Sequence, residues 1–280
     1  MSPVQSSVIL ASAIVLSALV SVVNSALPSQ FKLCSRNDPK VEQCIISAVD
    51  HIRKNLAEGD FGEGFDVPKL EPLYVEQMKM QRGQDFQAVF NKVNVYGAST
   101  FKIDRLQSKP SNLSFDLVTS IPKLNVTGKY SLKMKLLFLE LQGKGDIKGM
   151  LTNTKLSIKI RGYTETNKTA ANGTVTNGTA SNGTATNGTA SNGTDSKQYV
   201  RFNRLGIRLK IEGGRFQLDN LFNGDPVLGQ VGNQVINDNS RLFLDELIPG
   251  LERNLSRLFT EIVNNLLRTA TIDEMFPEKV

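Results

Sequence analysis

The chain has 280 residues, of which 40% are hydrophobic, and carries a formal net charge of +6. This length is enough for one large domain or two small ones with a substantial core. The lysines and arginines are spread along strand-like segments without interleaved aromatic residues. That pattern indicates a solvated basic face, with a weak preference for anionic surfaces as the alternative, and it argues against nucleic-acid binding.

The first 26 residues contain no charged side chain and include an apolar run from Val8 to Val23. This predicts a secretory signal peptide over residues 1–26, cleaved after Ser25 or Ala26. The alternative is a membrane anchor, but the run is short, and no later segment reaches the ~20 apolar residues that a transmembrane helix needs. We therefore expect a secreted, extracellular protein without stable membrane insertion.

The chain contains two cysteines, Cys34 and Cys44, shortly after the predicted signal peptide. In an oxidising compartment they should form a disulfide that ties an extended N-terminal strap to the first helix. That helix is predicted to begin at Asp38 and Pro39, because an N-cap residue is followed there by a proline suited to the first helical turn. It should end before Gly59, where a loop rich in glycine and proline leads into a sheet.

The middle of the chain predicts long antiparallel strands, each apolar on one face and charged on the other. Alternation is clearest from Leu124 to Phe138, and it recurs over residues 155–161 and 205–212. Strands with one dry face need an apolar element to wrap, and the C-terminal helix is the candidate. The residues predicted to face inward are Leu124, Val126, Tyr130, Leu132, Met134, Leu136, Phe138, Leu156, Ile158, Ile160, Leu205, Ile207, Leu209 and Ile211.

Between Gly162 and Gln198 the composition changes to a five-residue repeat of Asn, Gly, Thr, Ala and Ser or Thr. The repeat unit has no large apolar residue and cannot bury a core. Residues 164–198, approximately, are therefore predicted to be a disordered insert at a hairpin tip. Each repeat is also an N-glycosylation sequon. The predicted glycosylation sites are Asn112, Asn125, Asn167, Asn172, Asn177, Asn182, Asn187, Asn192 and Asn254.

The C-terminal region contains the most informative motif, NLFNGDPVLG from Asn220 to Gly229. One long amphipathic helix is predicted to follow it and to end at Met275–Pro277. Apolar residues between Leu244 and Leu266 recur at spacings of three and four, so one face of this helix must be covered. The opposite face is predicted to be wet, because it carries Glu246, Arg253, Arg257, Asn264 and Arg268.

This block resembles the C-terminal motif of the insect juvenile-hormone-binding and takeout-type proteins, with its Asn-Leu-Phe-Asn-Gly-Asp, one proline in the helix (Pro249) and a terminal Phe-Pro. The segment Phe-Asp-Val-Pro-Lys-Leu-Glu-Pro-Leu, residues 65–73, resembles that family's entry into its first long strand. The two cysteines resemble its N-terminal disulfide. One departure is Ser240, at a position where the family commonly has a bulky aromatic residue.

The resemblance implies an α+β fold, in which a long C-terminal helix is wrapped by a strongly curved antiparallel sheet. Such an elongated roll belongs to the tubular lipid-binding superfamily and has an internal apolar tunnel. Residues 27–280 would form a single domain, and the tunnel would hold a small lipophilic ligand. Periodicity alone leaves open whether the inward faces fill one another as a core or line a tunnel, and the resemblance favours the tunnel. The residues predicted to line it are Tyr130, Leu132, Met134, Leu136, Ile158, Ile207 and Leu209.

Tyr130 is the candidate hydrogen-bond donor to the ligand, since its ring shares the apolar face of the longest strand. The alternative is a tyrosine whose hydroxyl simply reaches the rim.

The sequence offers no motif for catalysis. Nucleophile-elbow, zinc-protease and phosphate-loop motifs are absent, and Ser-His or Cys-His chemistry could rest only on the single histidine, His51. We interpret His51 as a helix-surface residue, and we expect no metal site, no cofactor and no enzymatic activity. Paired carboxylates are neither favoured nor excluded.

Two functions remain. The first is a secreted carrier of one lipophilic molecule of the terpenoid-hormone, fatty-acyl or a related class. The alternative is a secreted structural or surface-interacting glycoprotein whose glycan-bearing repeat is the working part. We expect a monomer, with an unidentified receptor or a lipid surface as a further partner.

Overall fold

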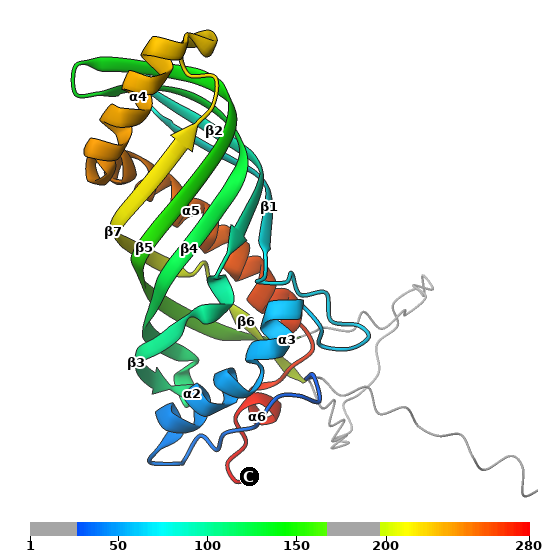
Figure 1. The fold of residues 1–280 in the computed structure, drawn as a ribbon. Coiled ribbons are helices and arrows are strands. Elements are labelled where there is room, and N and C mark those ends of the chain that lie inside the picture. The colour runs from blue at the N-terminus through cyan, green and yellow to red at the C-terminus, as the bar shows by residue number, and fades with distance from the viewer. Residues whose placement is uncertain (1–26, 167–196) are drawn as a thin grey trace, which may run out of the picture.

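The computed structural model describes residues 27–166 and 197–280. It shows a strongly curved antiparallel sheet whose hollow is occupied by a long C-terminal helix (Figure 1). The predicted α+β fold class is confirmed. The predicted signal peptide, 1–26, and the repeat with Asn167, Asn172, Asn177, Asn182, Asn187 and Asn192 lie outside the described residues.

Two very long strands, β4 and β5, form the centre of the sheet and pair from one end of β4 to the other, from Ser114↔Arg161 to Leu136↔Leu139. In one half of the molecule β2 and β1 extend the sheet beyond β4, and β7 extends it beyond β5 from Ile147 to Lys159, across the middle of the molecule. In the other half β3 pairs with β4, and β6 pairs with β5. The strands are β1 (Leu73–Arg82), β2 (Phe86–Tyr96), β3 (Lys102–Lys109), β4 (Ser114–Leu136), β5 (Leu139–Thr166), β6 (Gln198–Phe202) and β7 (Gly206–Leu218).

The alternation of inward and outward side chains is interrupted once on each of β4, β5 and β7. We call the line of these interruptions the crease. On β5 the inward-facing residues have odd numbers up to Leu151, and the next buried side chain is Thr154. Asn153, between them, has a positive φ of 51°. The same change occurs after Ile121 on β4 and after Ile211 on β7, while the pairing register stays constant. The crease therefore re-aims side chains without shifting the strands, which simple alternation could not predict.

The predicted single C-terminal helix is wrong, because the chain forms three helices there. Asp225 caps α4, accepting hydrogen bonds from the main-chain N–H groups of Val227 at 3.0 Å and Leu228 at 2.9 Å. Asn239 separates α4 from α5, and α5 ends well before Met275. The helices are α2 (Val41–His51), α3 (Arg53–Glu58), α4 (Pro226–Asp238), α5 (Ser240–Leu266) and α6 (Ile272–Met275), with short 3-10 turns at Ala98–Thr100, Pro110–Asn112 and Phe222–Gly224.

Asparagine side chains on α4 and α5 act as substitute strand partners. Asn233 accepts a hydrogen bond from the main-chain N–H of Leu218 at 2.8 Å and donates to its carbonyl at 2.9 Å. The same pair of bonds joins Asn237 to Phe216 and Asn264 to Phe202. They satisfy main-chain groups at the sheet edge, which would otherwise be available to another strand. Asn264 was predicted to lie on the solvent-exposed face of the helix. That prediction is wrong, because its side chain contacts the main chain of Phe202.

Two further expectations need correction. Phe138, predicted to face inward, lies in the β4–β5 turn and is 83% exposed. The insert was predicted to begin at about residue 164, but β5 continues to Thr166, which pairs with Gln198 at the start of β6. The two described strands that flank the repeat, β5 and β6, therefore pair with one another in antiparallel fashion.

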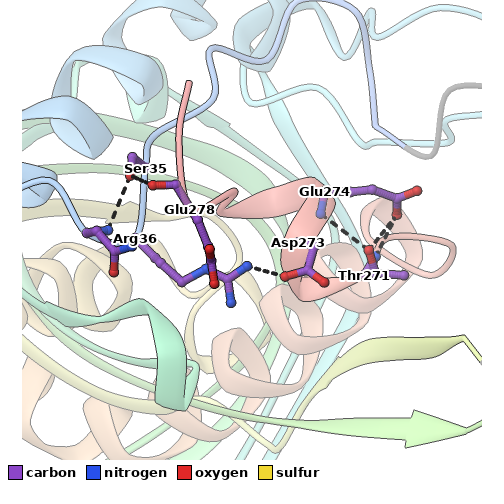
Figure 2. Close-up of polar contacts among 7 residues, drawn as sticks. Ser35, Arg36, Thr271, Asp273, Glu274 and Glu278 are labelled. Atoms are coloured by element: carbon purple, nitrogen blue, oxygen red, sulfur yellow. Dashed lines mark hydrogen bonds and ion pairs between the residues drawn. The ribbon is translucent and has the colours of Figure 1, made fainter.

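One end of the molecule is closed by contacts between the N-terminal strap and the C-terminal segment (Figure 2). The predicted disulfide Cys34–Cys44 joins the strap to α2. Beside it the Ser35 hydroxyl donates to the carbonyl of Glu278 at 2.6 Å, and the main-chain N–H of Arg36 donates to that of Pro277 at 3.0 Å. The Arg36 guanidinium also pairs with Asp273 of α6. The strap and the C-terminal segment thus hold one another in place.

Candidate functional site

An apolar cavity of about 180 Å³ lies between α5 and the concave face of the sheet. It is found where the two large core clusters meet: Met78 and Phe90 on its wall belong to one cluster, and Leu124 and Leu156 to the other. Figure 1 shows α5 running along the concave side of the curved sheet. The lining residues are Leu73, Val75, Met78, Phe90, Val93, Val95, Ala98, Ile121, Leu124, Val126, Ile147, Gly149, Leu151, Thr154, Leu156, Leu209, Ile211, Phe216, Leu244, Leu247, Leu251, Leu255 and Phe259.

The chemistry of this wall is nearly uniform. Apart from Gly149 and Thr154, every described residue that lines the cavity has an apolar side chain, and none is charged. Thr154 is 2% exposed, and its Oγ1 has no hydrogen-bond partner in the structure. Such a wall suits a largely hydrocarbon molecule.

An empty cavity of this size is unfavourable. At about 24 cal/mol per Å³, the 180 Å³ void would cost on the order of 4 kcal/mol of stability. Domains are stable by only about 5–15 kcal/mol, so this is a substantial fraction. A bound molecule that fills the void would recover it.

Tyr130 lies away from this cavity, inside the core cluster formed with β2 and the end of β7. It is 1% exposed, and its hydroxyl donates to the main-chain carbonyl of Asp219 at 2.7 Å. Burial, with a smaller contribution from the charge of Asp219, raises the pKa of Tyr130 to about 12. The segment that follows β7 passes close over β5 here: a Cβ on Gly143 would lie 3.0 Å from the Asn220 carbonyl oxygen and 2.7 Å from the Tyr130 hydroxyl. This hydroxyl therefore already has a protein partner.

The other predicted tunnel residues divide into three groups. Leu132, Met134 and Leu136 are buried in the same core cluster as Tyr130. Ile158 and Ile207 pack in the second cluster. Of the seven, Leu209 lines the cavity. Contact of the other six with a ligand stays a prediction that this geometry does not favour.

Several lining residues were foreseen only as apolar positions of a strand or helix. Leu124, Val126 and Ile211 belonged to predicted inward faces, and Leu251 and Leu255 to the covered face of the helix. Their alternation was visible, but whether an inward side chain meets a cavity or another side chain depends on sheet curvature. Thr154 lies two residues before Leu156, so the predicted inward face extends to it, but it was not named because its side chain is polar.

A second cavity of about 160 Å³ lies at the strap end, between α2 and the C-terminal segment. Phe31, Cys34 and Phe276 are among its lining residues, and no described residue lines both cavities. One continuous tunnel therefore stays a prediction. Ser240, the departure from the family pattern, lines an outer recess of about 380 Å³ with Gly213 and Gly214.

Three observations concern metal binding, the histidine and membrane insertion. Across 27–166 and 197–280, no group of three or more His, Cys, Asp and Glu side chains is placed to hold a metal ion. His51 is exposed at the end of α2. No helix of these two segments is long and apolar enough to cross a membrane.

The three sequons within the described residues differ in their surroundings. Asn112 and Asn125 are exposed. Asn254 lies within α5, where its side chain donates to the Gly250 carbonyl at 2.9 Å and accepts from Arg257 at 3.1 Å. Glycosylation at all three stays a prediction, and in the folded protein Asn254 is the least accessible of them.

Comparisons with known proteins agree with this architecture. The sequence model of the family described as haemolymph juvenile hormone binding protein matches residues 10–179 and 166–277. The circadian clock-controlled protein daywake of Drosophila melanogaster is 23% identical over 266 residues, covering 91% of this chain and 90% of its own. Its counterpart in Drosophila yakuba is 23% identical over 265 residues, covering 90% and 89%. The crystal structure of Takeout 1 from Epiphyas postvittana superposes with a TM-score of 0.65 at 15% identity, over 87% of this chain and 98% of that one.

Proposed function

The chain belongs to the haemolymph juvenile hormone binding protein family, and from this premise we propose that it is a secreted carrier of one small lipophilic molecule. The ligand would lie in the cavity between α5 and the sheet and would undergo no chemical change. The observation that carries this proposal is the apolar cavity of about 180 Å³ where the two core clusters meet.

The size and chemistry of the cavity indicate the ligand class. Burial of hydrocarbon contributes roughly 25 cal/mol per Å², so an isoprenoid or acyl chain can bind without charged contacts, after the cost of immobilising it is subtracted. The volume lies below the roughly 300–1,000 Å³ of most ligand pockets. A slender chain fits this volume best, and a bulkier terpenoid would require α5 to move away from the sheet.

The remaining parts of the proposal concern secretion and surface. The charge-free segment 1–26 would direct export, and the disulfide suits an oxidising compartment. The sequons would carry glycans, and the protein would act as a monomer. Delivery to a receptor or a lipid surface would complete the role of a carrier.

Native mass spectrometry of the protein secreted by insect cells tests the proposal. We expect a fraction with an added small-molecule mass that disappears after solvent extraction, and we expect the extracted protein to bind N-phenyl-1-naphthylamine with a rise in fluorescence. Absence of both would contradict the carrier function. The structural or surface-interacting glycoprotein would then be the better hypothesis.

A further inference from the structure

Two bulky apolar side chains project into solvent from the turn between β4 and β5. Leu137 is 50% exposed and Phe138 is 83% exposed. Since Leu136 pairs directly with Leu139, the turn consists of these two residues, and Leu137 has a positive φ of 55°. Such turns normally carry Asn, Asp or Gly, which tolerate a positive φ. Turn chemistry and burial therefore do not account for a leucine followed by a phenylalanine here.

Helix α4 adds a second exposed apolar surface at the same end of the molecule. A Cβ on Gly232 would lie 3.5 Å from Cδ2 of Leu141, so α4 packs directly on the start of β5. Leu141 is three residues from Phe138, about 10 Å along an extended strand. Figure 1 shows α4 and the green β4–β5 turn at the end of the molecule opposite the strap. The exposed residues of α4 are Val227, Leu228 and Val231, at 69%, 46% and 44%.

These five residues, Leu137, Phe138, Val227, Leu228 and Val231, are called the apolar tip below. Lysines follow it on the outer face of the hairpin. Between Ser131 and Lys144 that face carries three exposed lysines and one carboxylate, Glu140. Among the described residues none of the three lysines forms an ion pair, whereas Lys129, further from the turn, is paired with Asp146 at 2.8 Å. The three lysines are Lys133, Lys135 and Lys144.

We propose that the apolar tip docks the protein on the surface of a lipid bilayer that contains anionic phospholipids. The inference deepens the proposed carrier function, because it names the surface to which a carrier would deliver its ligand. Apolar side chains of interfacial segments enter the boundary between head groups and acyl chains by about 5–10 Å. Lys135 and Lys133 lie about 7 and 13 Å behind Leu137 along the strand. With Phe138 inserted, their ammonium groups would lie at the level of the lipid phosphates, which attract them.

The shape and size of the apolar tip favour a bilayer over a protein partner. A stable protein interface involves roughly 20–30 residues on each side. The tip offers five apolar side chains on a projecting turn and a helix, and a fluid bilayer can accept these without a matching shape. The sequons of the chain all lie outside residues 128–153 and 219–238, which contain the tip and its lysines. The predicted glycans would therefore leave this end uncovered.

Co-sedimentation of the full-length secreted protein with lipid vesicles tests the proposal. One vesicle population is phosphatidylcholine alone, and the other contains about 30% phosphatidylserine. We expect binding to the anionic vesicles, with at least tenfold lower affinity for phosphatidylcholine. Raising the salt from about 0.1 M to about 0.5 M should weaken binding to the anionic vesicles, because salt screens the lysines.

Two double variants separate the apolar from the electrostatic contribution. Leu137→Asn with Phe138→Ser removes both turn side chains and should lower vesicle affinity at least tenfold. Because asparagine suits the left-handed conformation, its melting temperature should stay within roughly 2 °C of wild type. Lys133→Gln with Lys135→Gln should lower affinity for anionic vesicles roughly 25-fold, at about fivefold for each charge, and should leave affinity for phosphatidylcholine unchanged.

Matched controls make the same changes elsewhere. Lys155→Gln with Lys210→Gln removes two exposed lysines that lie directly opposite one another on β5 and β7, away from the hairpin turn. Tyr163→Ser removes an aromatic residue, 49% exposed, near the other end of β5. Both controls should bind anionic vesicles within about twofold of wild type. Losses equal to those of the tip variants would indicate general attraction to lipid and would overturn the proposal.

Binding of N-phenyl-1-naphthylamine, measured without vesicles, separates this proposal from the carrier function. The tip variants should bind the fluorophore as the wild type does, because no residue of the apolar tip lines the cavity. A wild type that binds the fluorophore but not the anionic vesicles would overturn docking alone. So would a wild-type dimer that binds no vesicles and dissociates in Leu137→Asn with Phe138→Ser, because the tip would then face a second copy. Vesicle binding through the tip without fluorophore binding would support docking and contradict the carrier function.

Discussion

Tyr130 and Thr154 are both buried hydroxyl residues on inward faces of the central strands, yet their surroundings give them different roles. Tyr130 has a main-chain partner, the carbonyl of Asp219, and fixes the segment that follows β7. Thr154 has none and lines the cavity. At the scale of the residue, the Tyr130 hydroxyl is structural, and an unpaired but inaccessible hydroxyl such as that of Thr154 is not thereby a ligand contact.

Tyr130→Phe tests the structural role of the Tyr130 hydroxyl. The variant removes the hydrogen bond to Asp219 and should lower the free energy of unfolding by about 1 kcal/mol. Because Tyr130 does not line the cavity, affinity for N-phenyl-1-naphthylamine should stay within twofold of wild type. Urea unfolding and fluorophore titration measure the two quantities. A stable variant with weakened binding would instead support the sequence-based role of Tyr130 as a ligand donor.

Contacts between elements depend on a few charged side chains, and Glu42 is the clearest case. It lies in the first turn of α2 and accepts hydrogen bonds from the main-chain N–H and the hydroxyl of Ser108 on β3, both at 3.2 Å. Its own main-chain N–H and that of Ser108 hold the pKa of this carboxyl below its ordinary 4.5. The carboxylate therefore links α2 to the sheet in its ionised form.

This link predicts a pH dependence of known sign. Because the folded-state pKa of Glu42 is lowered, its contribution to stability is complete above the unfolded pKa of about 4.5 and is lost as the pH falls through the folded pKa. Glu42→Gln should therefore be less stable than wild type at pH 7, and the difference should shrink below pH 4.5. Thermal melts from pH 7 to pH 3 measure it, with Glu63→Gln on the exposed loop as control. An equal difference at every pH would contradict this role.

The spacing of apolar residues predicted the strands and helices better than it predicted the points at which they are interrupted. Leu132, Met134 and Leu136 face inward as their alternation with lysines required, and the helical spacing from Leu244 to Leu266 places α5 in the hollow of the sheet. The crease at Asn153 and the break at Asn239 were missed, because the spacing of apolar residues does not mark where a strand or a helix is interrupted. The cavity follows from the curvature of the whole sheet, so sequence could identify inward side chains but not those that border a void.

At the scale of the whole molecule, the repeat connects two paired strands, so we expect that it can be deleted without disturbing the fold. Thr166 and Gln198 are paired at the open end of the β5–β6 hairpin. Replacing residues 167–197 with a four-residue Gly/Ser turn shortens the loop and should leave stability unchanged or raise it by up to about 2 kcal/mol. Affinity for the fluorophore should not change. Endoglycosidase-treated wild type controls for the lost glycans, and loss of binding only in the deletion would show that the tract takes part in the site.

The position of the cavity between the two core clusters gives the sharpest test of the molecule as a carrier. Leu124 and Ile207 are both buried strand residues of the same core cluster, 8% and 5% exposed, but only Leu124 lines the cavity. Phenylalanine at either position adds carbons that must find space. At Leu124 they can enter the void, whereas at Ile207 they meet packed side chains and should cost about 1–3 kcal/mol.

We therefore expect Leu124→Phe to keep its melting temperature within roughly 2 °C of the extracted wild type, because the added carbons fill space that is otherwise empty. Its affinity for N-phenyl-1-naphthylamine should fall at least tenfold, since the ring occupies the place of the ligand. Ile207→Phe should melt early and, while folded, bind the fluorophore as the wild type does. Equal destabilisation of both variants with binding intact would show that the cavity is not the ligand site, because only competition for the same space links filling to lost affinity.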